Sequence, residues 1–335
     1  MKFTDILIPL VHDFWTIVKP VKVGTTTNDI SYCNWWQYKN LQEEWFSRFL
    51  LSRFPKVKNF NIRFYSVFGD RKNIKKYQNK INIFFSGENL EYIAKYESLD
   101  RRNSFNKFFC SLEQYKDYAI SDVDLTLGFG DIKNDKYLRF PLWIQTCFLP
   151  TSSYADIKDS VQAINDVKSR EKKEAVCINR HDIFGMRGKV CDDLNSILNI
   201  SYAGAWRNNT SELWDKYGND KLKYMNLFRF NICPENMDAP NYCTEKIFES
   251  FMAGCVPIYA GALNNPEPGV INKDAIILWN LDGDNTDNIK LVKKLSSDEA
   301  YYNKFIQQER LLPFASEYVY DRFTGLEAKI KELLS

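Results

Sequence analysis

Short runs of β-branched and aromatic residues alternate with longer stretches of helical periodicity along this chain. Such alternation is typical of parallel α/β architecture. The apolar runs predict strands within residues 29–35, 60–68, 81–87 and 117–121, and within 174–180, 198–204, 228–233, 255–261 and 275–280.

Two further stretches organise the chain. Residues 38–54 predict a helix with a buried stripe through Leu41, Trp45, Phe49 and Leu50. Residues 156–174 are charged and polar and separate the two series of strands. Because 335 residues favour two domains, we expect an N-terminal domain over 1–155 and a C-terminal domain over 165–335, which ends in an amphipathic helix.

Composition narrows the class of protein. The 45 basic and 43 acidic residues leave a net charge of +2, which argues against nucleic acid as a partner. Eight scattered cysteines without a close pair favour buried, reduced thiols in a cytoplasmic protein. The apolar run near the N-terminus is too short to span a bilayer, so we expect no transmembrane segment. Any membrane contact would be peripheral, at the inner face.

Histidine is scarce, since the chain holds only His12 and His181. A histidine-based triad or a site with several histidine ligands is therefore disfavoured. Proton transfer in any catalytic site is expected to fall to a carboxylate.

The stretch from Phe228 to Gly261 concentrates unusual chemistry between two apolar runs. Pro234 lacks an amide donor and ends strand pairing, so Glu235 and Asn236 are expected at the carboxyl end of a strand, where open α/β sheets bind ligands. Thr244 fits the N-cap of a helix over 245–254 that ends at Gly254. Its expected buried side chains are those of Ile247, Phe248, Phe251 and Met252.

Lys246 falls in the first turn of that helix. A cation is disfavoured there, because the amino end of a helix carries partial positive charge. The conflict disappears if an anion binds at this end, where free backbone amides and Lys246 would together form a phosphate site.

This stretch resembles the donor-binding motif of the bacterial and animal α1,3/4-fucosyltransferases, glycosyltransferase family ten, in which PEN and YCTEK match a pattern FxFENxxxxxYxTEKxxxAxxxGxxPxxxG. Further matches occur in family order: NWW at 34–36, FFSGEN at 84–89, DYAIS at 117–121, DKYLRFPLW at 135–143, and Arg187 ahead of a helix. The resemblance implies a GT-B fold, with two Rossmann-like domains facing a cleft. It also implies GDP-fucose as the donor and inversion at the anomeric carbon.

The resemblance assigns roles to residues at the matching positions. Glu88 becomes the general base, while Arg187 and Lys246 neutralise the diphosphate. Glu245, Asn236 and Tyr242 would line the donor pocket. Three further residues are not counted among the expected site residues. Glu235 is expected to orient the loop, and Trp35 and Trp36 are expected near the acceptor. No metal or other cofactor is expected beyond GDP-fucose as co-substrate.

The expected reaction is α1,3-fucosyl transfer to an N-acetylglucosamine-containing oligosaccharide, in synthesis of Lewis-type glycans or lipopolysaccharide. Pro234 replaces the phenylalanine of the family pattern and Cys243 a small residue, so a same-fold transferase using another nucleotide sugar stays open. A catalytically inactive glycan-binding relative is the other alternative. The pairs Asp122/Asp124 and Asp282/Asp284 match a DxD metal motif, but Arg187 and Lys246 already supply positive charge. The C-terminal heptad repeats of some bacterial members of that family are absent from this sequence. The chain is therefore expected to be a monomer.

Overall fold

The computed structural model describes residues 24–36, 40–74, 80–91, 99, 104–167 and 173–335. The described chain divides into two compact units. The first unit holds the described residues up to 153 together with 320–335, and the second unit holds 154–319.

The first unit is built on a six-stranded sheet with the order β1-β2-β3-β4-β5-β6, in which only the β1–β2 pair is antiparallel. Its strands are β1 (Gly24–Thr25), β2 (Ile30–Cys33), β3 (Ile62–Tyr65), β4 (Ile81–Phe85), β5 (Leu125–Gly128) and β6 (Tyr137–Arg139). Its helices are α2 (Trp45–Arg53), α4 (Ser104–Ser111) and α5 (Leu142–Cys147), with 3₁₀ turns η1 (Leu41–Glu43), η2 (Arg71–Asn73) and η3 (Leu112–Tyr115).

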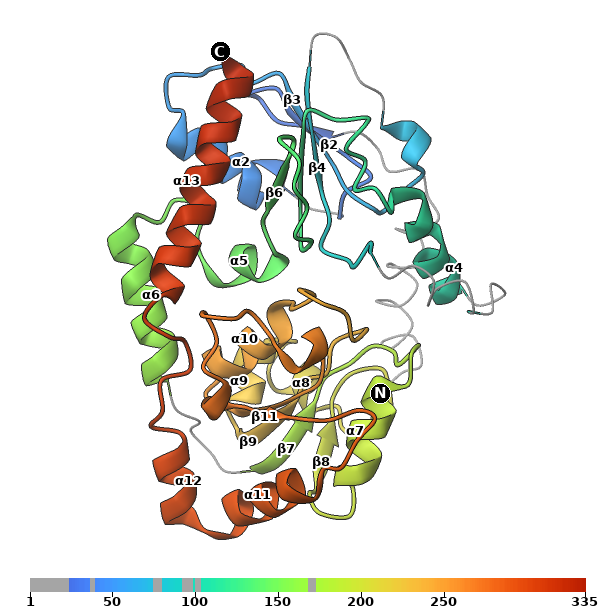
Figure 1. Cartoon of the computed structure of the whole chain (residues 1–335), viewed down its shortest axis with the longest axis vertical. Helices are drawn as coiled ribbons and strands as arrows, with labels where there is room; N and C mark the ends of the chain where they lie inside the picture. The colour runs from blue at the N-terminus through green and yellow to red at the C-terminus, as the bar shows by residue number, and fades with distance from the viewer. Residues whose placement is uncertain (1–23, 37–39, 75–79, 92–98, 100–103, 168–172) are drawn as a thin grey trace. The chain divides into compact units, whose positions relative to one another are not determined.

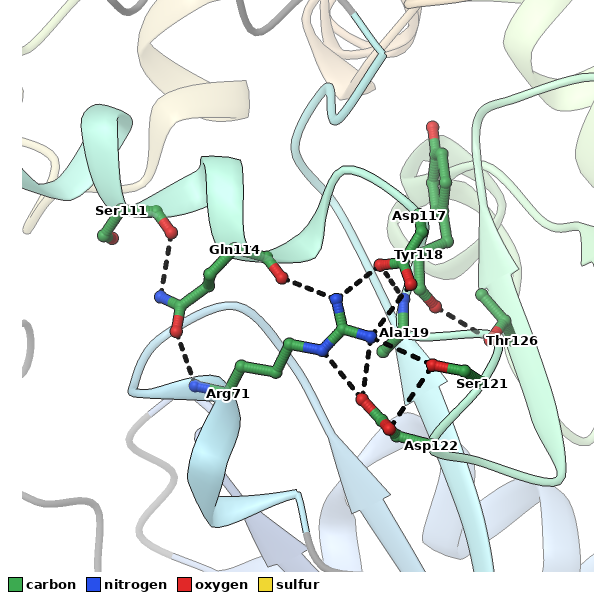
Figure 2. A network of polar contacts seen from close by, with 9 residues as sticks. All are labelled: Arg71, Ser111, Gln114, Asp117, Tyr118, Ala119, Ser121, Asp122 and Thr126. Atoms are coloured by element: carbon green, nitrogen blue, oxygen red, sulfur yellow. Dashed lines mark hydrogen bonds and ion pairs between the residues drawn. The ribbon is translucent and has the colours of Figure 1, made fainter.

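The expected strand over 117–121 is wrong. Tyr118 and Ala119 have left-handed backbone, with φ of 54° and 51°, and the next strand, β5, starts only at Leu125. Arg71 holds this turn in place, because its guanidinium pairs with Asp117 at 2.5 Å and with Asp122 at 2.7 Å (Figure 2). The aromatic and β-branched residues therefore predicted a strand where long-range ion pairs impose a turn.

The second unit carries a five-stranded, fully parallel sheet with the order β11-β10-β9-β7-β8. Its strands are β7 (Lys173–Cys177), β8 (Ile200–Tyr202), β9 (Phe228–Ile232), β10 (Val256–Tyr259) and β11 (Ile277–Leu278). Its helices are α6 (Tyr154–Asp166), α7 (Met186–Leu194), α8 (Glu212–Asp215), α9 (Lys221–Met225), α10 (Glu245–Met252), α11 (Thr286–Ser297) and α12 (Glu299–Phe305), with 3₁₀ turns η4 (Ala262–Asn264) and η5 (Lys273–Ala275).

Both faces of this second sheet are covered. Ala175 and Cys177 of β7 face a core that includes side chains of α7, α11 and α12, while Val176 faces a core with side chains of α8 and α9. Successive strand residues point to opposite faces, and a parallel sheet is stable only when both are buried. This explains why the strands read as continuous apolar runs.

The strand order creates a switch point between β7 and β9. The chain runs from β7 to β8 on one side, then crosses to β9 on the other side and continues outward to β10 and β11. Open parallel sheets bind ligands outside the carboxyl ends of strands at such a reversal. The carboxyl ends of β7 and β9 are therefore where a site is expected.

The last helix, α13 (Ala315–Leu334), starts in the second unit and ends in the first (Figure 1). In the first unit the ring of Phe323 lies 5.4 Å from that of Trp45 and 5.8 Å from that of Phe49. In the second unit Tyr154 donates a 2.6 Å hydrogen bond to Glu317. The aromatic contacts tie residues 320–335 to the first unit, although these residues follow the C-terminal domain along the chain.

Every other expected strand segment contains a strand, and β1, β5 and β6 are additional. The helix expected over 38–54 begins as a 3₁₀ turn and becomes α-helical at Trp45, with Phe46, Phe49 and Leu50 buried. Of the expected stripe, Leu41 and Trp45 are only half-buried. Most of the charged stretch 156–174 forms α6 and the start of β7.

Candidate active site

Two chain segments enter the region of the switch point from different strands. The end of β7 leads through residues 178–185 into α7, and the end of β9 leads through Pro234, Glu235 and Asn236 toward α10. The amino ends of α7 and α10 thus lie at the same edge of the sheet as the strand ends. The side chains at these positions form one connected cluster of charges and hydrogen bonds.

Glu235 is the centre of this cluster. Its carboxylate is fully buried and accepts hydrogen bonds from the backbone nitrogen of Thr244, the hydroxyl of Thr244 and the ammonium of Lys246, at 2.7, 2.7 and 2.9 Å. The hydroxyl of Tyr259 adds a longer bond of 3.3 Å. A buried carboxylate needs this degree of compensation, because an unpaired buried charge is strongly unfavourable.

Lys246 is therefore not a solvated lysine at the start of α10. Its side chain is 17% exposed and its ammonium also contacts the hydroxyl of Thr244 at 2.7 Å and Glu245 at 3.7 Å. Burial opposes the charge, but the negative charges of Glu235 and Glu245 raise the pKa of Lys246 above its ordinary value. The protein's own carboxylate, Glu235, thus supplies an anion at this helix end.

A glycine allows this arrangement. Gly261, just beyond β10, has φ of 148°, and a Cβ atom there would lie 2.7 Å from Cγ of Glu235 and 3.0 Å from the hydroxyl of Tyr259. Pro234 also fits, because the neighbouring amides of Cys233 and Glu235 donate to the carbonyls of Ile258 and Ala260. The amide that proline lacks would point away from β10, since alternate residues of a strand point opposite ways.

Arg187 brings the second cation to the cluster. Arg187 lies in the first turn of α7, which begins at Met186, and not ahead of the helix. Asp182 accepts the backbone N–H groups of Arg187 and Gly188 at 3.0 and 2.7 Å. Arg187 is 4% exposed, and its guanidinium donates to the carbonyl of His181 and, at 2.5 Å, to Asn236.

The Nε atom of Arg187 is buried and has no hydrogen-bond partner among the described residues. Burial lowers the pKa of this guanidinium from its ordinary value, although an arginine stays charged under ordinary conditions. An unsatisfied buried donor is costly, and it is often met at a site that binds a ligand.

His181 is a neutral neighbour of the two cations. Burial and then the charges of Arg187 and Lys246 lower its pKa to about 3. A guanidinium nitrogen of Arg187 lies 3.4 Å from Nδ1 of the ring. Because the imidazole is uncharged near neutral pH, it adds no further positive charge beside Arg187.

The remaining expected donor residues lie in the same unit. Asn236 contacts Arg187 directly, and Tyr242 is 2% exposed and within electrostatic reach of Arg187. Glu245 is the first residue of α10. Burial raises its pKa, but the charge of Lys246 and backbone hydrogen bonding together lower the pKa by more, so that the net shift is downward. The structure thus brings Arg187, Asn236 and Lys246 together through Glu235 and its partners.

Glu88 belongs to the first unit. It lies in a turn directly after β4, where the hydroxyl of Ser86 accepts the amide of Glu88 at 3.1 Å and donates to its carbonyl at 2.8 Å. The side chain is half-buried. In the same unit Trp35 is buried in the core, whereas Trp36 is half-buried and its ring lies 4.8 Å from that of Phe68.

The four carboxylates of the two DxD patterns contact residues of the chain. Asp122 pairs with Arg71 (Figure 2), and Asp124 accepts the amide of Asn82 at 2.9 Å. In the second unit Asp282 pairs with Lys189 at 3.0 Å, and Asp284 accepts both the amide and the hydroxyl of Thr286. Each of the four carboxylates therefore already has a partner in the described chain.

Three residues have a larger part in the cluster than the sequence predicts. Glu235 was expected only to orient the loop, and neither His181 nor Asp182 was expected in the site. The signal for Asp182 is weak, because a carboxylate five residues before Arg187 is outside the usual N-cap spacing. The importance of Glu235 follows from its burial and its bonds to Thr244 and Lys246, which only the folded structure produces.

Family models match most of the described chain. Residues 30–146 match the model for the "Alpha-(1,3)-fucosyltransferase FucT N-terminal domain", and residues 167–320 match "Glycosyltransferase family 10 (fucosyltransferase) C-term". The second match contains the complete cluster around Glu235, and the first contains Glu88.

Individual relatives are more distant. The chain is 26% identical over 270 residues to the alpha-(1,3)-fucosyltransferase FucT of Helicobacter pylori, covering 70% of this chain and 50% of that protein. It is 28% identical over 95 residues to alpha-(1,3)-fucosyltransferase B of Drosophila melanogaster, covering 28% of this chain and 21% of that protein. The chain thus spans half or less of the length of these relatives.

Solved structures share the fold. A crystal structure of alpha1,3-fucosyltransferase with GDP-fucose superimposes with a TM-score of 0.58 at 19% identity, covering 98% of this chain and 97% of the other. A crystal structure of alpha1,3-fucosyltransferase superimposes with a TM-score of 0.58 at 20% identity, over 89% of each chain.

The two α/β units therefore have the GT-B fold. Within that fold class, the two matching models place the chain in glycosyltransferase family 10, the fucosyltransferases. In the part of the chain that the structure describes, none of the helices combines the length and apolar character needed to cross a bilayer.

Proposed function

We propose that this protein is an inverting α1,3-fucosyltransferase that transfers fucose from GDP-fucose to an N-acetylglucosamine-containing oligosaccharide. The observation that carries the proposal is the cluster of Arg187, Asn236 and Lys246 around Glu235 at the switch point of the second sheet. Membership of family 10 supports fucose as the transferred sugar.

Breaking the bond between fucose and GDP leaves negative charge on the departing diphosphate. Arg187 and Lys246 are fixed by Asn236, His181 and Glu235 before the donor arrives, so they can stabilise that charge without reorganising. The unsatisfied Nε of Arg187 supplies a donor for a phosphate oxygen. In this proposal no metal ion is required for departure of the diphosphate.

The acceptor hydroxyl must lose its proton as it attacks the anomeric carbon. Glu88 is the proposed general base, since it is a carboxylate at the carboxyl end of a parallel strand and matches the family's SGEN glutamate. Glu245 and Tyr242 are proposed to line the donor site. Attack by the hydroxyl on the face opposite the leaving diphosphate inverts the anomeric configuration.

Two alternatives remain as outcomes of the test. A same-fold transferase could use another nucleotide sugar, because Pro234 replaces the phenylalanine of the family pattern. A glycan-binding relative without activity would bind the acceptor and transfer nothing. The hydrogen-bonded Glu235–Lys246 pair and the unsatisfied Nε of Arg187 favour an active enzyme over that relative.

The test is thermal unfolding of the full chain with GDP, UDP, CMP and GDP-fucose, in EDTA throughout. A ligand at 100 times its Kd adds about 2.7 kcal/mol to the stability of the folded state, which raises the melting temperature measurably. We expect selective stabilisation by GDP and GDP-fucose, followed by fucose transfer to N-acetyllactosamine. Stabilisation by UDP or CMP alone, or only after a divalent metal replaces EDTA, contradicts the proposal.

The eight cysteines carry free thiols in the structure, six of them buried, which supports the proposed cytoplasmic location. Peripheral contact at the inner membrane face is part of the same proposal. The products expected from such a transferase are Lewis-type glycans or lipopolysaccharide side chains.

A further inference from the structure

The chain makes an unusual turn directly after β10. Three successive residues that are not glycine, Ala262, Leu263 and Asn264, have left-handed backbone with φ of 52°, 51° and 55°. This region is unfavourable for L-residues because the Cβ atom crowds the following carbonyl oxygen, and it is visited as single residues. Such strain persists only where the surroundings hold it, and it concentrates at functional sites.

The turn is hydrogen-bonded to the loop that carries the candidate site. The amide of Leu263 donates to Oδ1 of Asp238 at 2.7 Å, and Asp238 follows Asn236 by two residues. At its start, Gly261 packs against Glu235. The strained turn is therefore linked directly to the loop that carries the cluster around Glu235.

The strained turn presents an apolar side chain to solvent. Leu263 is 57% exposed, whereas its neighbour Ala262 is 2% exposed. Glycine or asparagine would adopt this backbone at lower cost, and an exposed leucine adds nothing to the core. The combination of strain and exposure indicates that an apolar group is needed at this position.

The position is within reach of a donor sugar. Two residues of chain span at most about 7 Å, so the Cα atom of Asp238 lies within that distance of the Cα atom of Asn236. The side chain of Asn236 contacts Arg187, and Leu263 is bonded to Asp238. In a nucleoside diphosphate sugar the hexose is bonded directly to the distal phosphate. If the diphosphate binds Arg187 and Lys246, its sugar lies beside this loop.

Resting on the proposed function, we propose that Leu263 is a specificity-determining residue that contacts the methyl group at C6 of a 6-deoxyhexose donor. A methyl group offers no hydrogen bond and gains from contact with a leucine side chain. A hydroxymethyl group at the same place would lose hydrogen bonds to water. The contact therefore selects for a deoxy sugar.

The test compares two donors with the chain described above, GDP-fucose and GDP-D-arabinose, which has the same ring without the methyl carbon. One methylene in an apolar contact changes kcat/KM by about 10- to 200-fold. We expect the wild type to prefer GDP-fucose by at least about 10-fold. In Leu263→Asn the preference should fall toward one, through loss of the rate with GDP-fucose. Leu263→Met should retain it.

Stability gives a second readout. Leu263→Asn should melt about 2–4 °C above the wild type, because asparagine tolerates left-handed backbone. The matched control is Leu149→Ala, a 61% exposed leucine in the first unit, which should leave both donors' rates unchanged. A preference retained in Leu263→Asn, or equal losses with both donors, overturns this assignment alone. Absence of any transfer by the wild type overturns the proposed function as well.

Discussion

The ammonium of Lys246 lies 2.9 Å from a carboxylate oxygen of Glu235, and Glu235 is completely buried. The pair resolves the apparent conflict of a lysine in the first turn of α10, since the carboxylate compensates both the lysine and the amino end of the helix. The carboxylate also bonds Thr244, so the pair links the end of β9 to the start of α10.

We expect Glu235→Gln to lower the free energy of unfolding by about 3 kcal/mol, because it leaves Lys246 largely buried without a counter-ion. Urea unfolding measures the change. In the double variant Glu235→Gln/Lys246→Met the loss should be smaller than the sum of the two single losses by about 1–3 kcal/mol. Additive losses would show that the two side chains do not interact.

Gly261→Ala should also destabilise the second unit. The new Cβ atom would lie 2.7 Å from Glu235 on backbone with φ of 148°, so we expect a loss of about 2 kcal/mol or more. Gly218→Ala is the matched control, since Gly218 has positive φ but nothing within 4 Å. Its expected cost is about 1 kcal/mol, from backbone strain alone. Equal losses in the two variants would contradict the close approach to Glu235.

Arg187 should be needed for turnover rather than for folding. We expect Arg187→Ala to lower kcat by about 10²- to 10³-fold, as for loss of one preorganised donor. Arg187→Lys should recover only part of this, because an ammonium cannot bond the carbonyl of His181 and Asn236 as a planar guanidinium does. Arg207→Ala removes an exposed arginine that pairs with Asp192 in the same unit and serves as the control. Near-normal turnover in Arg187→Ala contradicts the proposed mechanism.

Glu88→Gln should separate binding from transfer. Loss of a general base lowers kcat by about 10²- to 10⁴-fold, while the Kd for GDP should stay at the wild-type value because the residues proposed to bind the diphosphate lie in the other unit. Calorimetric titration with GDP and a transfer assay measure the two effects. Glu91→Gln, which changes a carboxylate three residues further on, is the control. If Glu88→Gln weakens GDP binding instead, Glu88 belongs to the donor site.

His181 should make stability depend on pH. Its pKa is lowered to about 3 in the folded chain, against about 6.5 when unfolded. Below pH 6.5 the unfolded chain binds a proton that the folded chain does not, so the free energy of unfolding falls as pH decreases toward 3. Between pH 7 and pH 5 this group alone accounts for a loss of about 2 kcal/mol.

His181→Gln should remove that loss, whereas His12→Gln, which changes the only other histidine, leaves His181 and its effect in place. Urea unfolding at both pH values provides the measurement. The carboxylates with lowered pKa, such as Glu212 at about 2, lose their contribution only as pH falls below about 4.5. An unchanged pH dependence in His181→Gln would mean that the ring is accessible to protons in the folded protein.

Much of the architecture could be predicted from local sequence. Apolar runs such as those of β7 and β9 are short and bounded by polar residues, and the helix from Glu245 to Met252 has a threonine before it and Gly254 after it. These signals act over a few residues, so they do not depend on the rest of the fold. The same is true of the unfavourable position of Lys246, which by itself indicates an anion at the start of that helix.

Other features depend on contacts between residues far apart in sequence. Local preference does not specify the strand order that creates the switch point. It is opposed by the turn at Tyr118, which Arg71 holds, and by the left-handed backbone of Leu263. Burial makes these long-range contacts decisive, because a charge such as that of Glu235 is tolerated in the protein interior only when packing brings its partners to it. The sequence by itself thus determined the elements and the chemistry available at their ends. The tertiary structure alone decided which of those ends meet and which charges are paired there.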